Sequence, residues 1–293
     1  MTYLAIRNFP HYYEWLTTAG TQRTGKPVLV FLHGWGGSAR YWVGTAQSLQ
    51  DQFDCLLYDL RGFGRSQIPQ ADKERTRGTA AAIKYPSENP YGLDTYATDL
   101  LELLNQLNLE RVYLQAHSLG TSIAAFFLNQ WGDRVERVVL TCAGVFEYDP
   151  LAFAAFYRFG SQVVKFRPRW LYGLPGMDRL VMQRFLHRPI APSDRQAFLE
   201  DYLLAENDAA LGTLVDAVSQ RATEVLPQQF SGLTMPTLLI SGACDRIIPA
   251  QLGRNAAALN EAIDYAIINH VGHFPMLEDQ PTYLEIVRSF LLV

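Results

Sequence analysis

The stretch from 111 to 128 constrains the fold of this chain more than any other. Its first half is an apolar, β-prone run, and its second half has the spacing of a helix. Between them lies the pentapeptide Ala116-His-Ser-Leu-Gly120, whose small outer residues permit a very tight strand-to-helix turn around Ser118. A serine on such a turn projects its hydroxyl above the sheet, at the start of the helix. The pattern predicts a nucleophilic serine, although a serine that caps a helix would look the same in isolation.

Apolar, strand-like segments alternate with helical segments along most of the chain. The run 28–32 is continuously apolar, as is typical of a strand buried on both faces of a parallel sheet. Further strand-like segments lie at 53–58, 135–143, 236–241 and 264–268. Helical spacing is present at 93–107, around 251–260 and from about 281. This alternation predicts an α/β fold with a mostly parallel sheet flanked by helices.

The segments 3–17 and 67–91 do not follow this alternation. Two edge-type strands are predicted at 3–9 and 12–17, with a break at Pro10. Residues 67–91 are polar, lack a period and predict a long surface loop. Loops of this length are often functional, but an ordinary surface excursion is the favoured interpretation.

Between 146 and 230 the strand–helix alternation stops. This segment is predicted to be largely helical, interrupted by prolines, with aromatic residues interleaved among arginines. We therefore expect one core domain, formed by 1–145 and 231–293, into which 146–230 is inserted as a helical cap. Because ligand pockets are mostly apolar, cap aromatics are candidates for substrate binding, namely Phe153, Phe156 and Tyr157. Alternatively, these aromatic side chains form a small hydrophobic core within the cap itself.

Composition argues against several classes of protein. With 48% hydrophobic and 18% charged residues, the chain is expected to bury a substantial core. The formal net charge of −4 gives no reason to expect a nucleic-acid partner. Its three cysteines suggest no disulfide framework, and the N-terminus lacks the pattern of a signal peptide. Because no apolar run approaches the ~18 residues that span a bilayer, we expect a soluble, cytoplasmic protein.

A nucleophilic serine needs a base and a carboxylate that orients the base. His270 and His273 both follow the last predicted strand, and His273 is favoured because its neighbours form a turn that can aim the ring at the sheet edge. Asp245, in the loop after the penultimate strand, is the predicted acid, with Glu147 or Asp149 as the runner-up. An aspartate that caps the next helix would occupy the same position as Asp245.

The oxyanion of an acyl-transfer reaction needs backbone donors near the serine. The N–H of Leu119 lies at the start of the helix, and the N–H of Trp35 lies in the glycine-rich turn 33–37 after a predicted strand. The Trp35 side chain is then free to line the pocket, and a core or cap contact is compatible with that role. His33 is expected to shape this turn, and His117 is expected to point away from the serine.

With these motifs, the chain resembles the α/β-hydrolase superfamily, in the branch with a helical cap. The matching segments are His33-Gly-Trp-Gly36, Asp59-Leu-Arg-Gly-Phe-Gly-Arg-Ser66, the pentapeptide around Ser118, Gly242-Ala-Cys-Asp245 and Gly272-His273. The resemblance implies an eight-stranded sheet, no cofactor and no metal, and it implies that Arg61 and Arg65 belong to a structural turn. Two features depart from the family pattern: Ala116 replaces a glycine, and the 67–91 loop is long. Serine at the turn argues against the dehalogenases and epoxide hydrolases of this superfamily, which use aspartate there.

The resemblance implies a hydrolase that acts on a small-molecule substrate. We expect cleavage of a carboxylic ester, or a thioester, of a largely apolar substrate through an acyl-enzyme intermediate. In this interpretation Ser118 attacks, His273 acts as base and then acid, and Asp245 orients His273. The N–H groups of Trp35 and Leu119 stabilise the oxyanion.

Three further interpretations use the same fold. One is C–C bond hydrolysis of a dienoate-type substrate, whose carboxylate Arg158 or Arg169 would bind. Another is a ligand-binding protein that has the pocket but no turnover. A third is contact between an edge of the cap and an anionic membrane surface, although a solvated cap helix is the favoured interpretation of this segment. The residues of that edge are Lys165, Phe166, Arg167, Arg169, Trp170 and Leu171. The sequence does not define an oligomeric state.

Overall fold

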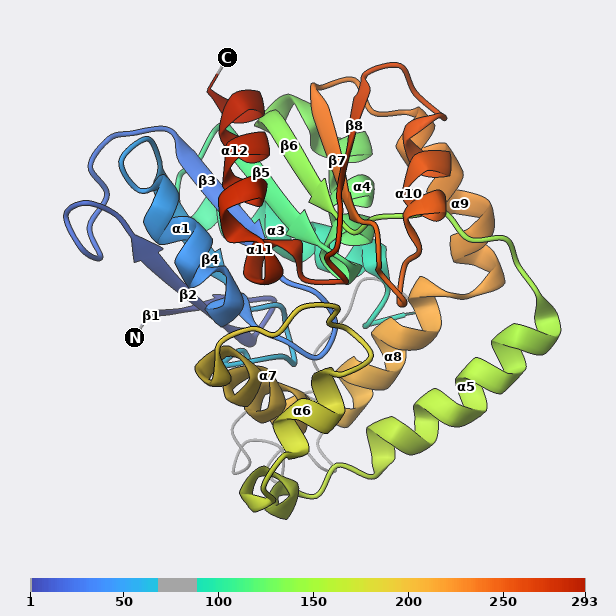
Figure 1. The fold of residues 1–293 in the computed structure, drawn as a ribbon. Coiled ribbons are helices and arrows are strands. Elements are labelled where there is room, and N and C mark those ends of the chain that lie inside the picture. Colours follow the sequence, from blue (N-terminus) through green and yellow to red (C-terminus); the bar gives the residue numbers. More distant parts are fainter. Residues whose placement is uncertain (1, 68–88, 293) are drawn as a thin grey trace.

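An eight-stranded sheet forms the centre of the molecule (Figure 1). The computed structural model describes residues 2–67 and 89–292. The strand order is β1-β2-β4-β3-β5-β6-β7-β8, in which β2 is antiparallel to both of its neighbours and all other pairs are parallel. The strands are β1 Thr2–Ile6, β2 Phe9–Leu16, β3 Val28–Leu32, β4 Asp54–Tyr58, β5 Val112–His117, β6 Val135–Thr141, β7 Thr237–Gly242 and β8 Ile263–Ile268. The predicted α/β fold is confirmed.

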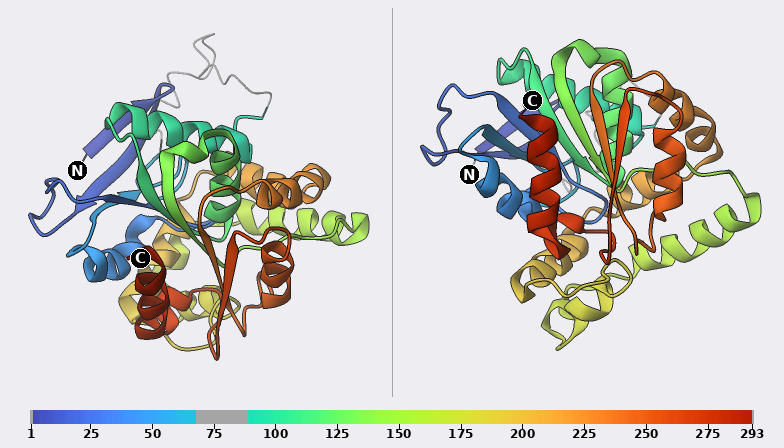
Figure 2. Two further views of the ribbon diagram at one scale, coloured as in Figure 1. Left: turned by 90° about the horizontal axis from the view of Figure 1, so that it is seen from above. Right: turned by 45° about the horizontal axis from the view of Figure 1, so that its top comes forward.

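Helices cover both faces of this sheet (Figures 1 and 2). On one face lie α1 (Val43–Leu49), α11 (Pro275–Glu278) and α12 (Gln280–Leu291). On the other lie α3 (Leu93–Gln106), α4 (Leu119–Trp131) and α10 (Ala250–Ala257).

The central strand β3 shows why its sequence is continuously apolar. Val28, Val30 and Leu32 pack into the core beside α3 and α4. Leu29 and Phe31 point the other way, into the core beside α1 and α12. Alternate residues of a strand face opposite sides of the sheet, so a strand between two helical layers must be apolar at every position.

The predicted break at Pro10 is wrong. The chain reverses at Arg7 and Asn8, which have φ values of 49° and 67°, and Pro10 lies inside β2 opposite Ala5. Pairing of β2 with β4 begins only at Tyr13. Proline is tolerated at this point of the sheet because β2 has a single neighbouring strand there.

Other local predictions differ less. The short helices η1 (Ala39–Trp42) and α1 were not predicted, although Ser38 caps η1 by accepting a hydrogen bond from the N–H of Arg40. The strand β6 ends two residues early, at a turn where Cys142 has a φ of 53°. Most of the predicted 67–91 loop, residues 68–88, lies outside the described part of the chain.

The chain between β6 and β7 leaves the sheet and is helical. Its elements are α5 Pro150–Lys165, η3 Arg169–Gly173, α6 Met177–Met182, α7 Pro192–Leu204, α8 Asn207–Ala217 and α9 Gln220–Ser231. Figures 1 and 2 show α6, α7 and α8 across the carboxyl ends of the parallel strands, and α5 along the outside of the molecule. This insertion therefore covers the edge of the sheet at which the candidate residues collect.

Candidate active site

Ser118 occupies a strained turn between β5 and α4. Its φ and ψ are 53° and −121°, a conformation that is rare for residues other than glycine. A Cβ atom added to Gly120 would lie 2.8 Å from the carbonyl oxygen of His33, so a side chain there would collide with backbone. Ala116 is inside β5 without a positive φ, and its methyl group is buried. Strain at the turn is thus concentrated at the serine, as is common at functional sites.

His273 lies between Ser118 and Asp245. Its Nε2 is 2.9 Å from the Ser118 hydroxyl oxygen, and its Nδ1 is 2.7 Å from a carboxylate oxygen of Asp245. Because a carboxylate only accepts, Nδ1 carries the hydrogen and Nε2 is left to accept from the serine. The side chains of His273 and Asp245 are buried. The structure therefore brings the three predicted residues together.

The loop after β7 fixes the orientation of the Asp245 carboxylate. Its second oxygen accepts hydrogen bonds from the N–H groups of Ile247 and Ile248, at 2.7 and 3.0 Å. The runner-up acids Glu147 and Asp149 are exposed on the cavity wall, and Asp149 accepts from the N–H of Leu151. Asp245 is thus the acid bonded to the histidine.

The other candidate histidines have different surroundings. His270 is exposed and has a φ of 58°, so it is not a packed neighbour of the site. His33 is buried, and its Nε2 accepts a hydrogen bond from the N–H of Leu60 at 2.8 Å, while its Nδ1 donates to the carbonyl oxygen of Gly34 at 2.8 Å. Its contacts thus join its own turn to the loop after β4. Burial lowers the pKa of the His33 imidazole.

His117 connects the turn after β3 to the loop of His273. Its Nε2 is 2.7 Å from the carbonyl oxygen of His273, so Nε2 must be the donor. Its Nδ1 accepts from the Tyr41 hydroxyl at 2.9 Å, and that hydroxyl accepts from the N–H of Gly34. Burial, and then the proximity of His273, hold the pKa of His117 well below its usual value, which keeps the ring neutral. Tyr41 was not singled out from the sequence.

Leu119 directly follows Ser118 in the chain, and Gly34, the residue before Trp35, approaches Ser118 in space. Leu119 is the first residue of α4, so its N–H has no partner in a preceding helical turn. A Cβ added to Gly34, the residue before Trp35, would lie 3.0 Å from the Ser118 Cβ. The Trp35 indole donates to the carbonyl oxygen of Ala210 at 2.8 Å, so its ring bridges the core and the insertion.

Glu278 holds the insertion against the loop that carries His273. Its buried carboxylate accepts from the N–H groups of Gly272, Phe274, His187 and Arg188, at distances from 2.7 to 3.2 Å. One side chain thus fixes two segments that lie far apart in sequence. The sequence offered no signal for it, because an acidic residue followed by a helix is usually only a cap.

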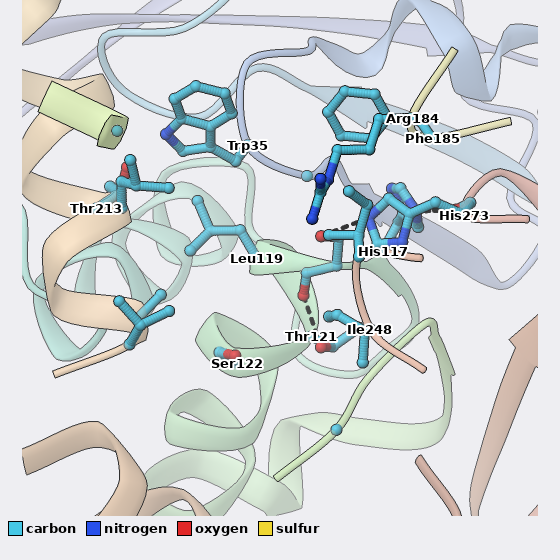
Figure 3. Close-up of a pocket in the computed structure, with 18 of the residues that line it drawn as sticks. Trp35, His117, Leu119, Thr121, Ser122, Arg184, Phe185, Thr213, Ile248 and His273 are labelled. Carbon is cyan, nitrogen blue, oxygen red and sulfur yellow. Dashed lines mark hydrogen bonds between the residues drawn. The ribbon is translucent and has the colours of Figure 1, made fainter. Parts of the chain in front are cut away.

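A cavity of about 940 Å³ opens above these residues, between core and insertion. Trp35, Leu119 and Thr213 lie on one side of it, with Phe185 and His273 on the other (Figure 3). Most of the remaining lining is apolar, including Phe146, Phe153, Val163, Phe198, Leu214 and Ile248. The cavity therefore suits a substrate with a large apolar part.

The candidate substrate-binding residues divide into three groups. Trp35 and Phe153 line the cavity. Tyr157 does not line it and is exposed instead. The side chain of Phe156 lies outside what the structure describes.

Arg184 is a cavity residue that the sequence analysis missed. It precedes Phe185, whose carbonyl oxygen accepts from the N–H of His273 at 2.7 Å, and its side chain points toward the histidines in Figure 3. It is the only lysine or arginine among the described lining residues, and no described residue pairs with it. The candidates Arg158 and Arg169 do not line the cavity. No sequence pattern indicated this residue, because an arginine of the insertion looks the same in sequence whichever way its side chain faces.

One group of side chains has donor atoms at metal-ligand spacing. The ligand atoms of His117, Cys142 and His273 lie within 4.8 Å of one another and are buried. All four ring nitrogens of the two histidines already make hydrogen bonds, and burial raises the pKa of the Cys142 thiol. A neutral thiol and occupied imidazoles fit a metal ion poorly.

Comparisons with known proteins place this geometry in a family. Residues 27–280 match the model of the alpha/beta hydrolase fold. An uncharacterised protein of Mycobacterium bovis is 26% identical over 277 residues, covering 90% of this chain and 75% of that protein. A 2-hydroxy-6-oxononadienedioate/2-hydroxy-6-oxononatrienedioate hydrolase of Paraburkholderia xenovorans is 25% identical over 281 residues, covering 91% of this chain and 87% of that enzyme.

A solved structure agrees with the match. The enol-lactonase of Burkholderia xenovorans superposes with a TM-score of 0.77 at 20% identity, over 100% of both chains. In the described part of this chain, no helix combines the length and the apolar character needed to cross a bilayer. The chain belongs to the alpha/beta hydrolase fold family.

Proposed function

We propose that this protein is a serine hydrolase that cleaves a carboxylic ester, or a thioester, through an acyl-enzyme intermediate. The observation that carries the proposal is His273, which makes hydrogen bonds of 2.9 Å to Ser118 and 2.7 Å to Asp245. Along the chain these residues have the order serine, acid, histidine, which is typical of this fold.

Each of the three residues has one task in the proposed reaction. Ser118 attacks the acyl carbon while His273 Nε2 takes the hydroxyl proton, and the Asp245 carboxylate stabilises the resulting imidazolium. His273 then returns the proton to the departing alkoxide or thiolate, which leaves the acyl group on the serine. Water, activated by the same nitrogen, attacks the acyl-enzyme and releases the acid.

Two backbone groups are proposed to stabilise the developing oxyanion. The N–H of Leu119 lies at the positive end of α4, and the close approach of Gly34 to Ser118 brings the Trp35 backbone beside the same point. Backbone donors are held in place before the reaction begins. They therefore stabilise charge without reorganising.

The cap that we propose for 146–230 closes over the acyl or alcohol part of the substrate. The insertion supplies Phe153 and Phe185 to the cavity wall, and the core supplies Trp35. A cavity of about 940 Å³ accommodates a chain of substantial length. We therefore propose a largely apolar ester as substrate.

A fluorophosphonate probe tests this proposal without knowledge of the substrate. Such a probe reacts covalently with an activated serine, so we expect a single adduct on the peptide that contains Ser118. Ser122 lines the same cavity, so the Ser122→Ala variant is the control and should be labelled like wild type. An unlabelled protein, or equal labelling of Ser118→Ala, would favour a ligand-binding protein without turnover.

C–C bond hydrolysis is a second candidate because of Arg184. Such a reaction needs a cation that binds the carboxylate of a dienoate, and Arg184 is an arginine of the cavity wall without a partner among the described residues. The relative from Paraburkholderia bears the name of a hydrolase of such a dienedioate. Turnover of a dienoate with none of any ester would favour this candidate.

A further inference from the structure

The insertion carries a cluster of exposed aromatic and apolar side chains. Phe166 is 70% exposed, Trp170 60%, Leu180 57% and Tyr172 51%, and all lie within fifteen residues of one another. Phe166 directly follows α5, and the others belong to η3 and to α6, which pack against each other. Scattered exposed apolar residues are normal, but a group of this size on one segment indicates an interaction surface.

The same segment is strongly basic in an acidic protein. Residues 151–184 contain six basic residues and one acidic residue, Asp178, although the formal net charge of the chain is −4. Lys165, Arg169 and Arg179 are exposed beside the aromatic residues. Arg167 does not belong to this surface, because it is buried and donates to three backbone carbonyl oxygens.

Three nearby acidic groups are already paired with arginines outside this surface. Asp178 pairs with Arg195 at 2.8 Å. The acids near the end of α7, which packs against η3 and α6, are Glu200 and Asp201, and both pair with Arg40 of the core.

We propose that this surface docks on an anionic membrane. We call it the cap face, and it consists of Lys165, Phe166, Arg169, Trp170, Tyr172, Arg179 and Leu180. Tryptophan and tyrosine favour the interface between water and lipid, while lysine and arginine bind anionic headgroups. An acidic protein partner would complement the charge but would not need four exposed apolar side chains.

The cap face is continuous with the cavity at Leu180, which is exposed and also lines the cavity wall. An apolar substrate that leaves the bilayer would therefore meet apolar side chains from the membrane to the catalytic serine. This places the substrate of the proposed hydrolase among esters that partition into lipid. Docking itself does not require hydrolysis, so it is tested separately from the proposed function.

Vesicle sedimentation tests the docking. Wild type and Ser118→Ala are each mixed with vesicles of phosphatidylcholine alone or with added phosphatidylserine, at low and high salt. We expect both proteins to bind the anionic vesicles at low salt, with weaker binding at high salt and on neutral lipid. Quenching of tryptophan fluorescence by brominated lipid, lost in Trp170→Phe, would place the cap face at the bilayer.

Variants separate the contribution of the basic side chains to docking from that of the aromatic side chains. Lys165→Gln/Arg169→Gln/Arg179→Gln should weaken partitioning on the order of a hundredfold, since each basic side chain near the surface contributes about fivefold. Phe166→Ser/Trp170→Ser should abolish quenching. Leu259→Ser, an exposed leucine after α10, is the matched control and should bind as wild type.

Three outcomes would overturn the inference. One is absence of binding to any vesicle. Another is binding that is unaffected by both sets of variants. The third is concentration-dependent self-association that the Phe166→Ser/Trp170→Ser variant removes, without vesicle binding, since the cap face would then join two copies of the chain.

Discussion

The imidazole of His117 donates a hydrogen bond to the backbone carbonyl oxygen of His273, with 2.7 Å between the two atoms. His117, the residue before Ser118, therefore supports the loop that carries His273. Through Tyr41, the same ring is connected to the N–H of Gly34, beside the proposed oxyanion donor Trp35. The proposed nucleophile, the proposed base and the turn after β3 are thus parts of one hydrogen-bonded network.

Tyr41→Phe should lower kcat about tenfold while KM stays within about threefold of wild type. The variant removes the donor to His117 and leaves the N–H of Gly34 without its buried acceptor, a loss of about 1–3 kcal/mol. Tyr202→Phe is the matched control, since Tyr202 lines the same cavity but its hydroxyl only donates to the carbonyl oxygen of Val163. Steady-state kinetics on one ester decides, and equal effects of the two variants would contradict the role of the network.

Glu278→Gln should destabilise the protein by about 1.5–3 kcal/mol, because hydrogen bonds to a charged acceptor are replaced by weaker ones and one buried donor loses its partner. Four backbone N–H groups depend on this carboxylate. Denaturant unfolding measures the change. Glu285→Gln, on the exposed side of α12, should unfold as wild type. A Glu278 variant as stable as this control would show that the insertion is held by other contacts.

Arg184→Gln should lower kcat/KM at least tenfold for a 4-nitrophenyl monoester of a dicarboxylic acid, because a guanidinium binds a carboxylate by charge-assisted hydrogen bonds. A neutral 4-nitrophenyl alkanoate of matched length should be hydrolysed within about threefold of wild type. Arg158→Gln is the control, since Arg158 is exposed and does not line the cavity. Equal losses on both esters would mean that Arg184 maintains the cavity rather than recognising charge.

His11→Asn should reduce the loss of stability in acid. Burial, and then Arg61 and Arg7, lower the pKa of His11 to about 3, so the folded protein keeps this ring neutral where the unfolded chain protonates it, below about pH 6.5. His11 therefore contributes stability above pH 6.5 that is lost as the pH falls, at about 1.4 kcal/mol per pH unit.

The free energy of unfolding must be compared between wild type and His11→Asn at each pH, because other groups also change it with pH. Buried carboxyls act in the opposite direction, as with Asp201, whose pKa burial raises to about 6. The difference in free energy of unfolding between wild type and His11→Asn should narrow from pH 7.5 to pH 5.5 by roughly that amount per unit below 6.5. His187→Gln, at an exposed histidine, is the control variant. A constant difference for His11→Asn would contradict the assignment.

The core of the fold could be predicted because each strand is recognised from a local pattern in the sequence. A strand such as β3 is apolar at every position, and Ser118, Asp245 and His273 each follow a strand of the parallel sheet, so their meeting at one edge follows from the topology. What the sequence did not indicate depends on contacts between distant segments. The contacts of four N–H groups with Glu278, the hydroxyl of Tyr41 and the direction of Arg184 depend on how distant segments pack, which no local pattern encodes.

The reversal between β1 and β2 shows the same limit at short range. Proline is usually a strand breaker, and Pro10 was expected to separate the strands. The chain instead reverses at Arg7 and Asn8, which have positive φ, and the resulting register places Pro10 opposite Ala5. Asparagine favours this conformation, so the turn signal was present but the proline was given more weight.

The central claim is tested most directly by hydrolysis of 4-nitrophenyl esters, from acetyl to palmitoyl, by wild type, Ser118→Ala and Ser122→Ala. Both serines line the cavity, but only Ser118 is bonded to His273. We expect Ser118→Ala to lose at least about a thousandfold in kcat, because the serine acts as a unit with its base and acid, and Ser122→Ala to stay within about threefold. An optimum at one chain length would give the size of the acyl site. Equal turnover by Ser118→Ala and wild type would contradict the account.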